Sequence, residues 1–246
     1  MRNRFLDSLS ALDLAAITPD MARMSCCAGE KLGSAGISDS HVFFPLSLVA
    51  SFALPSRRCG IGMVGREGVI GWEAILGLAA PNFEARVLFD GGTMLAMSVS
   101  KLRNACFSRP TLSMSLLRFV QRHSLQLGCL ANSGVSANIP QRVGAWLLML
   151  HDRIDGDFIA ITHSELADQL DIRRASVTEA LHLLEGDGAV GCKRGQIFIR
   201  DRETLEIAAD FAYHRRSSYR PRIKGSPHEK RGGRDCAAML RRRLVE

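Results

Sequence analysis

Residues 161–201 read ITHSELADQLDIRRASVTEALHLLEGDGAVGCKRGQIFIRD. The stretch begins with a capping box, in which the hydroxyl of Thr162 and the carboxylate of Glu165 can satisfy the free amides of a new helix. Asp171 and Ile172 predict a tight turn after this short helix. These signals indicate a helix and a turn that bring the chain to a second helical segment.

The second helix is predicted from near Arg173 to about Glu185. Its apolar residues recur at helical spacing and should pack inward: Val177, Ala180, Leu181 and Leu184. Arg173 stands where a hydroxyl N-cap is usual, so we expect a weakly capped start. The Gly-Asp-Gly at 186–188 marks its end.

Two short strands are predicted next, Ala189–Cys192 and Gln196–Ile199, joined by the basic segment Lys193–Gly195. Helix, turn, helix and a hairpin with a basic tip form a winged helix-turn-helix. Such a module places its second helix in the major groove of DNA.

The outward side of the second helix carries groups that can read base edges. Arg174 can pair with both acceptors of a guanine, and Glu179 can accept from a cytosine amino group. Ala175 or Thr178 could touch a thymine methyl. Phosphate contacts are expected from a second set: Thr162, Arg173, Ser176, His182, Lys193 and Arg194. The alternative is an ordinary solvated helix whose charges have no partner in DNA.

These residues resemble the C-terminal domain of the Crp/Fnr family of bacterial transcription regulators. The resemblance rests on Ile161–Thr162, Glu165–Ala167, Arg174–Val177, Leu181, Leu184–Glu185, Gly188 and Ile197–Asp201. Upstream, His41–Pro45 and Val64–Gly71 look like the β-roll signatures of members without an evident cyclic-nucleotide pocket. The similarity covers most of the chain to about residue 210, and it implies a sensor roll joined to the DNA-binding module.

The residues and the resemblance together predict an α+β fold. Its parts are an N-terminal antiparallel β-roll of the jelly-roll, cyclic-nucleotide-binding-like kind, a long dimerisation helix and a C-terminal winged helix-turn-helix. The expected division is 1–110 for the roll with an N-terminal helix, 111–138 for the dimerisation helix and hinge, 139–213 for the DNA-binding domain and 214–246 for a basic, disordered tail. Within the roll, short apolar or alternating runs separated by Gly, Pro, Asn and Asp predict strands: 42–44, 48–54, 61–64, 85–89 and 94–99. The N-terminal helix is predicted over residues 3–17.

The segment 69–87 lacks the pattern expected of a cyclic-nucleotide site. Binders of this fold use a Gly-Glu segment for the ribose and an Arg followed by a small hydroxyl residue for the phosphate. Here Arg86 is followed by Val87, and Glu84 precedes it, where it would oppose an anion. We therefore expect no cyclic AMP binding. Trp72, Glu73 and Arg86 are candidates for the pocket of an unknown effector, and packing in the core or on the surface is the alternative for each.

The stretch from Pro110 to about Ser133 predicts the helix that pairs two copies of the chain. Its apolar residues alternate at spacings of four and three, the seam expected of paired helices: Leu116, Val120, His123, Leu127 and Leu130. In the family that this chain resembles, a helix at this place mediates homodimerisation. A helix buried only within its own chain is the alternative. Gly134–Pro140 is predicted to be a hinge, followed by a helix over 141–153.

Charge and composition set further limits. The 246-residue chain has a formal net charge of +7, but residues 215–246 hold eleven Lys and Arg against three acidic residues, so the rest is close to −1. The DNA prediction therefore rests on where charges lie, not on their sum. The chain shows neither an apolar run long enough for a membrane nor a signal peptide, so a cytoplasmic protein is expected.

The seven cysteines form no C-x-x-C pair, and Cys26–Cys27 alone would supply too few thiols for an iron–sulfur cluster. A metal-dependent barrel enzyme would need clustered histidines, yet residues 24–100 contain only His41. A Gly-rich phosphate loop and a nucleophile elbow are also lacking. We therefore expect no enzyme, catalytic residue, metal or cofactor.

The sequence predicts a homodimeric, sequence-specific transcription regulator that binds double-stranded DNA at a palindromic operator. RNA polymerase is an expected partner, and the effector is open. The alternative is a ligand-binding roll whose winged helix contacts another protein instead of DNA.

Overall fold

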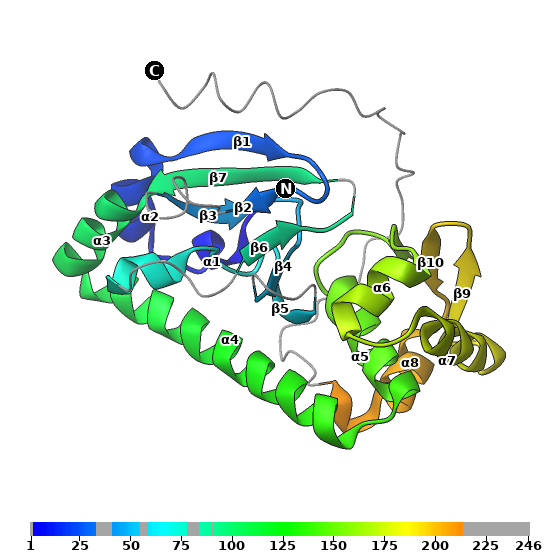
Figure 1. Cartoon of the computed structure of the whole chain (residues 1–246). Helices are drawn as coiled ribbons and strands as arrows, with labels where there is room; N and C mark the ends of the chain where they lie inside the picture. The colour runs from blue at the N-terminus through cyan, green and yellow to red at the C-terminus, as the bar shows by residue number, and fades with distance from the viewer. Residues whose placement is uncertain (1, 33–40, 55–58, 78–83, 90, 214–246) are drawn as a thin grey trace.

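The computed structural model describes residues 2–32, 41–54, 59–77, 84–89 and 91–213. Within these ranges the helices and strands form two packed units beside one long helix (Figure 1). The basic segment 214–246, predicted to be disordered, lies outside the described residues. In the part of the chain that is described, no helix is both long and apolar enough to cross a membrane.

The N-terminal segment forms two helices instead of the single helix predicted. They are α1 (Arg4–Asp7) and α2 (Ala11–Ile17), followed by the 3-10 turn η1 (Thr18–Asp20). Each helix has its own N-cap, because the Asn3 side chain accepts from the Leu6 amide and the Ser10 side chain from the Asp13 amide. The second cap starts a new helix where the apolar pattern alone suggested continuity.

The roll consists of two antiparallel sheets, as predicted. One has the strand order β1 (Ala22–Cys26), β7 (Gly92–Ser98), β3 (His41–Pro45). The other has the order β2 (Lys31–Leu32), β6 (Glu84–Val87), β4 (Ala50–Ala53), β5 (Gly60–Val64). Their inner side chains form a core that includes Phe43, Phe44, Phe52, Met94 and Met97. Burial of this apolar surface is the main force that holds the roll together.

Three helical elements follow the strands or lie between them. The 3-10 segment η2 (Trp72–Leu76) and the helix α3 (Val99–Ser108) were not foreseen in the sequence. The long helix α4 (Pro110–Ser136) was predicted, and it runs beneath the roll to the second unit (Figure 1). Its Phe119 ring meets the Phe5 ring edge-on, and its His123 ring lies 5.6 Å from that of Phe52.

The C-terminal domain contains α5 (Ile139–His151), β8 (Phe158–Ile159), α6 (His163–Leu170), α7 (Arg174–Gly186), β9 (Val190–Lys193), β10 (Gln196–Ile199), α8 (Arg202–Ala209) and η3 (Asp210–Ala212). The helix α5 is buried almost throughout and forms the centre of the domain core. The strand β8 was not predicted; it pairs with β10 and completes a three-stranded sheet.

The predicted hinge at 134–140 is shorter in the structure. The helix α4 continues to Ser136, and α5 already begins at Ile139. A capping box between Asn138 and Gln141, which the sequence analysis overlooked, fixes that start. Only Ala137 and Asn138 remain between the two helices.

The edge strand β5 and the loop after it join the roll to both neighbours. A Cβ on Gly60 would lie 2.6 Å from the Trp146 ring of α5, and one on Gly62 would lie 2.6 Å from Leu127 of α4. Beside Gly60, the hydroxyl of Ser51 donates to the Gln169 side chain of α6 at 2.6 Å, in a buried position. The absence of side chains on Gly60 and Gly62 therefore lets the other elements approach the backbone of β5 closely.

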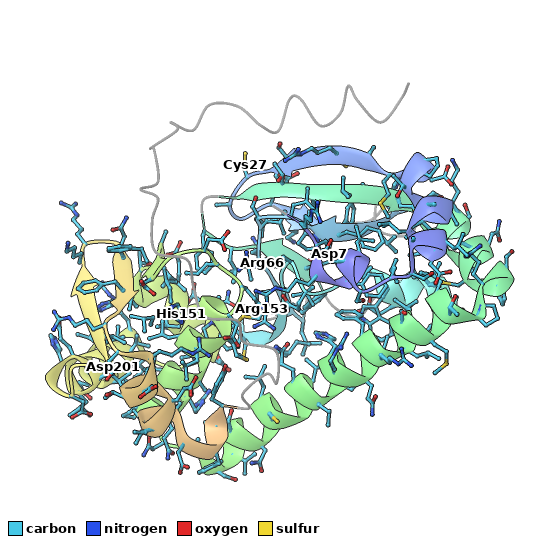
Figure 2. The ribbon with its side chains drawn as sticks, turned by 180° about the vertical axis from the view of Figure 1, so that it is seen from behind. Asp7, Cys27, Arg66, His151, Arg153 and Asp201 are labelled. Carbon is cyan, nitrogen blue, oxygen red and sulfur yellow. The ribbon has the colours of Figure 1, made fainter. Side chains whose placement is uncertain are left out.

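A buried ion pair completes this junction. The Arg153 Nε lies 2.8 Å from the Glu67 Oε1, although the N–H is not aligned for a hydrogen bond. The guanidinium also donates to the Met149 carbonyl at 2.6 Å, and Arg66 forms an ion pair with Asp155 at 2.6 Å. Figure 2 shows Arg66 and Arg153 between the roll and the C-terminal domain. Charged groups from both units are thus held together where they meet.

Candidate nucleic-acid interface

The first helix of the candidate interface starts as predicted. The Thr162 hydroxyl accepts from the Glu165 amide at 3.2 Å, and the Glu165 carboxylate accepts from the Thr162 amide at 2.8 Å. The helix α6 ends at Asp171, which has the left-handed φ of 52° that Asp tolerates better than most residues. This turn sets the direction of α7.

The helix α7 divides into two faces in the way that its periodicity predicts. Val177, Ala180, Leu181 and Leu184 are buried. The opposite face is exposed and carries Arg174, Ala175, Glu179, His182 and Leu183. Arg173 makes no side-chain capping bond, so the prediction of a weakly capped start is confirmed. This exposed face is polar except for Ala175 and Leu183.

Thr178 lies on the same face, but its hydroxyl is engaged within the protein. It donates to the Arg174 carbonyl at 3.1 Å, and it lies 3.0 Å from Nδ1 of His163 at the start of α6. His163 was not among the predicted site residues. Periodicity gives no signal for it; its only mark in the sequence is that it directly follows the capping Thr162.

The wing presents its basic tip to solvent. Lys193 and Arg194 are exposed, and Gly195 makes the turn with a φ of 73°. The Phe198 ring lies across from Gly191 on β9, where a Cβ would collide with it at 2.2 Å. The Lys193 ammonium lies 5.6 Å from the centre of this ring, so the aromatic face helps to place the cation.

Arg200 is a third basic residue of the wing, and it was not among the predicted site residues. Its guanidinium lies 5.2 Å from the centre of the Phe198 ring and 3.6 Å from Glu185. The signal was available, because Arg200 directly follows the last predicted strand. With Arg173, Arg174, Lys193 and Arg194 it gives the exposed side of α7 and the wing five cationic side chains.

Residues 141–207 match the family model of the Crp-like helix-turn-helix domain. The fold as a whole is that of known regulators. A Crp/Fnr-family transcriptional regulator from Eubacterium rectale is 14% identical, with a TM-score of 0.63 over 82% of this chain and 96% of that one. The chain has the fold of the Crp/Fnr transcription regulators and carries a Crp-like helix-turn-helix domain.

Two further structures of this fold cover nearly their whole length. FixK2 from Bradyrhizobium japonicum is 17% identical, with a TM-score of 0.63 over 77% of this chain and 98% of that one. CLP, a c-di-GMP-responsive global regulator of Xanthomonas campestris, is 14% identical, with a TM-score of 0.61 over 78% of this chain and 100% of that one. No match was found among curated protein sequences. The Eubacterium rectale protein and CLP are both described as regulators.

The three candidate effector residues lie on two different elements of the Crp/Fnr-like roll. Trp72 and Glu73 lie in η2, and burial raises the pKa of the Glu73 carboxyl. Arg86 lies instead on the outer side of β6, where it lines a cavity of about 490 Å³ that faces α6. Its guanidinium is 3.7 Å from Glu84. Neither Trp72 nor Glu73 lines this cavity.

The five residues of α4 that were predicted to pair two copies of the chain differ in their exposure to solvent. Leu116 and His123 are buried against their own roll, together with Phe119. Val120, Leu127 and Leu130 are partly buried. The exposed apolar residues of α4 lie elsewhere on the helix: Met114, Leu117, Leu125 and Val135. The outward face of α4 is therefore rotated away from the predicted seam.

Among the described residues, no group of three or more His, Cys, Asp and Glu side chains is placed to hold a metal ion. Of the cysteines in this part of the chain, Cys26 is buried and the others are partly buried. Burial raises the pKa of the Cys106 and Cys192 thiols, which keeps them protonated at neutral pH.

Proposed function

We propose that this protein is a sequence-specific DNA-binding transcription regulator that acts as a homodimer on a palindromic operator. One observation supports this most strongly: the exposed face of α7 carries side chains that can pair with base edges, and it lies in the same domain as the cationic wing, a domain that matches the Crp-like model. In this proposal, residues 1–110 sense a signal, 111–138 pair two copies and 139–213 bind DNA.

Arg174, Ala175, Thr178 and Glu179 are the proposed base-reading residues. Arg174 is exposed in the first turn of α7, the part of a recognition helix that meets base edges. Because the Thr178 hydroxyl is already bonded within the protein, its proposed contribution is a methyl contact with thymine. Thr162, Arg173, Ser176, His182, Lys193 and Arg194 are proposed to hold phosphates, joined by Arg200.

The proposed dimer forms through the outward face of α4. Met114, Leu117, Leu125 and Val135 are exposed at spacings that fit one side of a helix, and a Cβ on Gly128 would meet nothing within 4 Å. A second copy of the same helix would cover this face and leave the recognition helices on one side of the dimer. The two half-sites of the operator are then expected roughly 34 Å apart, one turn of DNA.

Selection of bound DNA from a random pool tests this proposal directly. Full-length protein should enrich an imperfect palindrome whose half-site centres lie roughly one helical turn apart. Enrichment of a single, non-repeated site would contradict the homodimer. The absence of enrichment at low salt would reject DNA reading and favour a winged helix that contacts another protein.

Arg174→Ala should weaken binding to the selected operator by about 1–3 kcal/mol for each half-site and relax the preference at one base pair. Lys193→Ala is the matched control, because a lost phosphate contact should weaken binding to operator and random DNA alike. Fluorescence anisotropy with both duplexes measures the difference. Equal losses on the two duplexes for Arg174→Ala would remove the base-reading role from this residue.

A further inference from the structure

His163 links the start of α6 to the face of α7 that is proposed to meet DNA. The imidazole is partly buried, and its Nδ1 lies 3.0 Å from the hydroxyl oxygen of Thr178. That hydroxyl oxygen in turn lies 3.1 Å from the Arg174 carbonyl, one helical turn back. A base-reading arginine, a threonine and a histidine are thereby connected by two hydrogen bonds.

The direction of these bonds defines which nitrogen of His163 can titrate. A threonine hydroxyl has one hydrogen, and a backbone carbonyl can only accept, so Thr178 donates to Arg174. The oxygen of Thr178 must then accept from Nδ1–H of His163. This bond is the same in the neutral and the charged imidazole, so Nε2 is the nitrogen that gains and loses the proton.

Two side chains of α7 act electrostatically on His163: Arg174, which is cationic, and His182, which can become cationic. Burial lowers the pKa of His163 first, and these two side chains lower it further. On its own helix, the nearby carboxylate of Glu165 is engaged with the amide and hydroxyl of Thr162. In the free protein at neutral pH the imidazole is therefore neutral.

We propose that His163 takes up a proton when the protein binds DNA and then donates from Nε2 to a backbone phosphate, so that DNA affinity rises as the pH falls. This inference rests on the proposed DNA-binding function. A phosphate brought to this face supplies the negative charge that favours the imidazolium. Thr178 acts as a positioning residue, because it fixes the ring through Nδ1 and leaves Nε2 for the ligand.

The sign follows from linkage. A group that binds a proton more tightly in the complex makes binding stronger as the pH falls from its pKa in the complex to its pKa in the free protein. In the free protein, the pKa of His163 lies below the ordinary value for histidine. Each proton taken up can change the affinity by at most about tenfold per pH unit, and a dimer has two such residues.

Binding of the full-length protein to the selected operator should be measured by anisotropy between about pH 8 and pH 6 at constant ionic strength, the range in which histidines titrate. The wild type should gain affinity as the pH falls. His163→Gln should lose most of this gain, so that its affinity falls furthest below that of the wild type at the acidic end of the range. Lys193→Ala is the matched control, because it removes a proposed phosphate contact of the wing that involves no imidazole; it should weaken binding at every pH but keep the gain.

Thr178→Val provides a second test, because it preserves the shape and the methyl group but removes the acceptor for Nδ1. We expect it to reduce the pH-dependent gain, and the NMR titration of His163 should show a pKa that rises on addition of DNA in the wild type. An unchanged pH profile in His163→Gln would overturn the inference. If the protein bound no DNA at any pH, the proposed function itself would fail, and this result is distinct from pH-independent binding.

Discussion

Arg153→Met should lower the free energy of unfolding by about 3–5 kcal/mol, the usual cost of removing one partner from a buried ion pair. Arg153 is 3% exposed and Glu67 is 7% exposed, so the substitution would leave a carboxylate in the interior. It would also remove the donor to the Met149 carbonyl. The side-chain amide of Gln126 in α4 is oriented so that its nitrogen donates to the Met63 carbonyl at 2.9 Å. In this orientation its oxygen accepts from the Arg153 guanidinium. One side chain therefore bonds to three parts of the chain.

Urea denaturation followed by tryptophan fluorescence and by circular dichroism measures this loss. Trp146 is well placed as a probe, because its ring lies against Gly60 at the junction. The double variant Arg153→Met with Glu67→Gln should lose less than the sum of the single variants, since no buried charge is left unpaired. Lys31→Met is the control: its pair with Glu84 is partly exposed to solvent, and its loss should cost no more than about 1 kcal/mol. Similar losses for Arg153→Met and Lys31→Met would contradict the importance of the buried pair.

The C-terminal domain could be predicted from the sequence because its signals are local. A capping box, an apolar stripe and a glycine turn each lie within a few residues of the feature that they define, and α6, α7, β9 and β10 were found in this way. The strand β8 was missed because it has two residues, Phe158 and Ile159, and exists only through its pairing with β10. The base-reading and phosphate-binding roles on this frame stay predictions.

Contacts between elements that are distant in the sequence could not be predicted. The glycines of β5 are visible in the sequence, but nothing local shows that Gly60 meets α5 and α6 or that Gly62 meets α4. For the same reason His163 was not predicted as a site residue, because its bond to Thr178 depends on how α6 and α7 cross. The same limit applies to the effector candidates: Trp72 and Glu73 lie in η2 and Arg86 in β6, and their role stays a prediction.

The predicted dimer seam shows how burial decides between two apolar stripes of one helix. Periodicity correctly indicated an amphipathic helix but could not distinguish the side that faces the roll from the side that faces a second copy. Leu116 and His123 lie on the roll side, where His123 stacks on Phe119. The exposed residues of α4 therefore offer the sharper test of the dimer.

Leu125→Glu should convert the dimer into monomers and lower operator affinity by at least about 100-fold, because the second half-site is then no longer bound at a high effective concentration. Leu125 is 56% exposed within one protomer, so a charge there should leave the fold of the monomer intact, yet it would be buried against a second copy. Sedimentation velocity and anisotropy on operator and half-site duplexes measure the two effects. Ile207→Glu is the control, a still more exposed apolar position that lies on α8 instead of α4. A Leu125→Glu protein that stayed dimeric, or a loss of affinity equal on operator and half-site, would place the dimer contact on another surface.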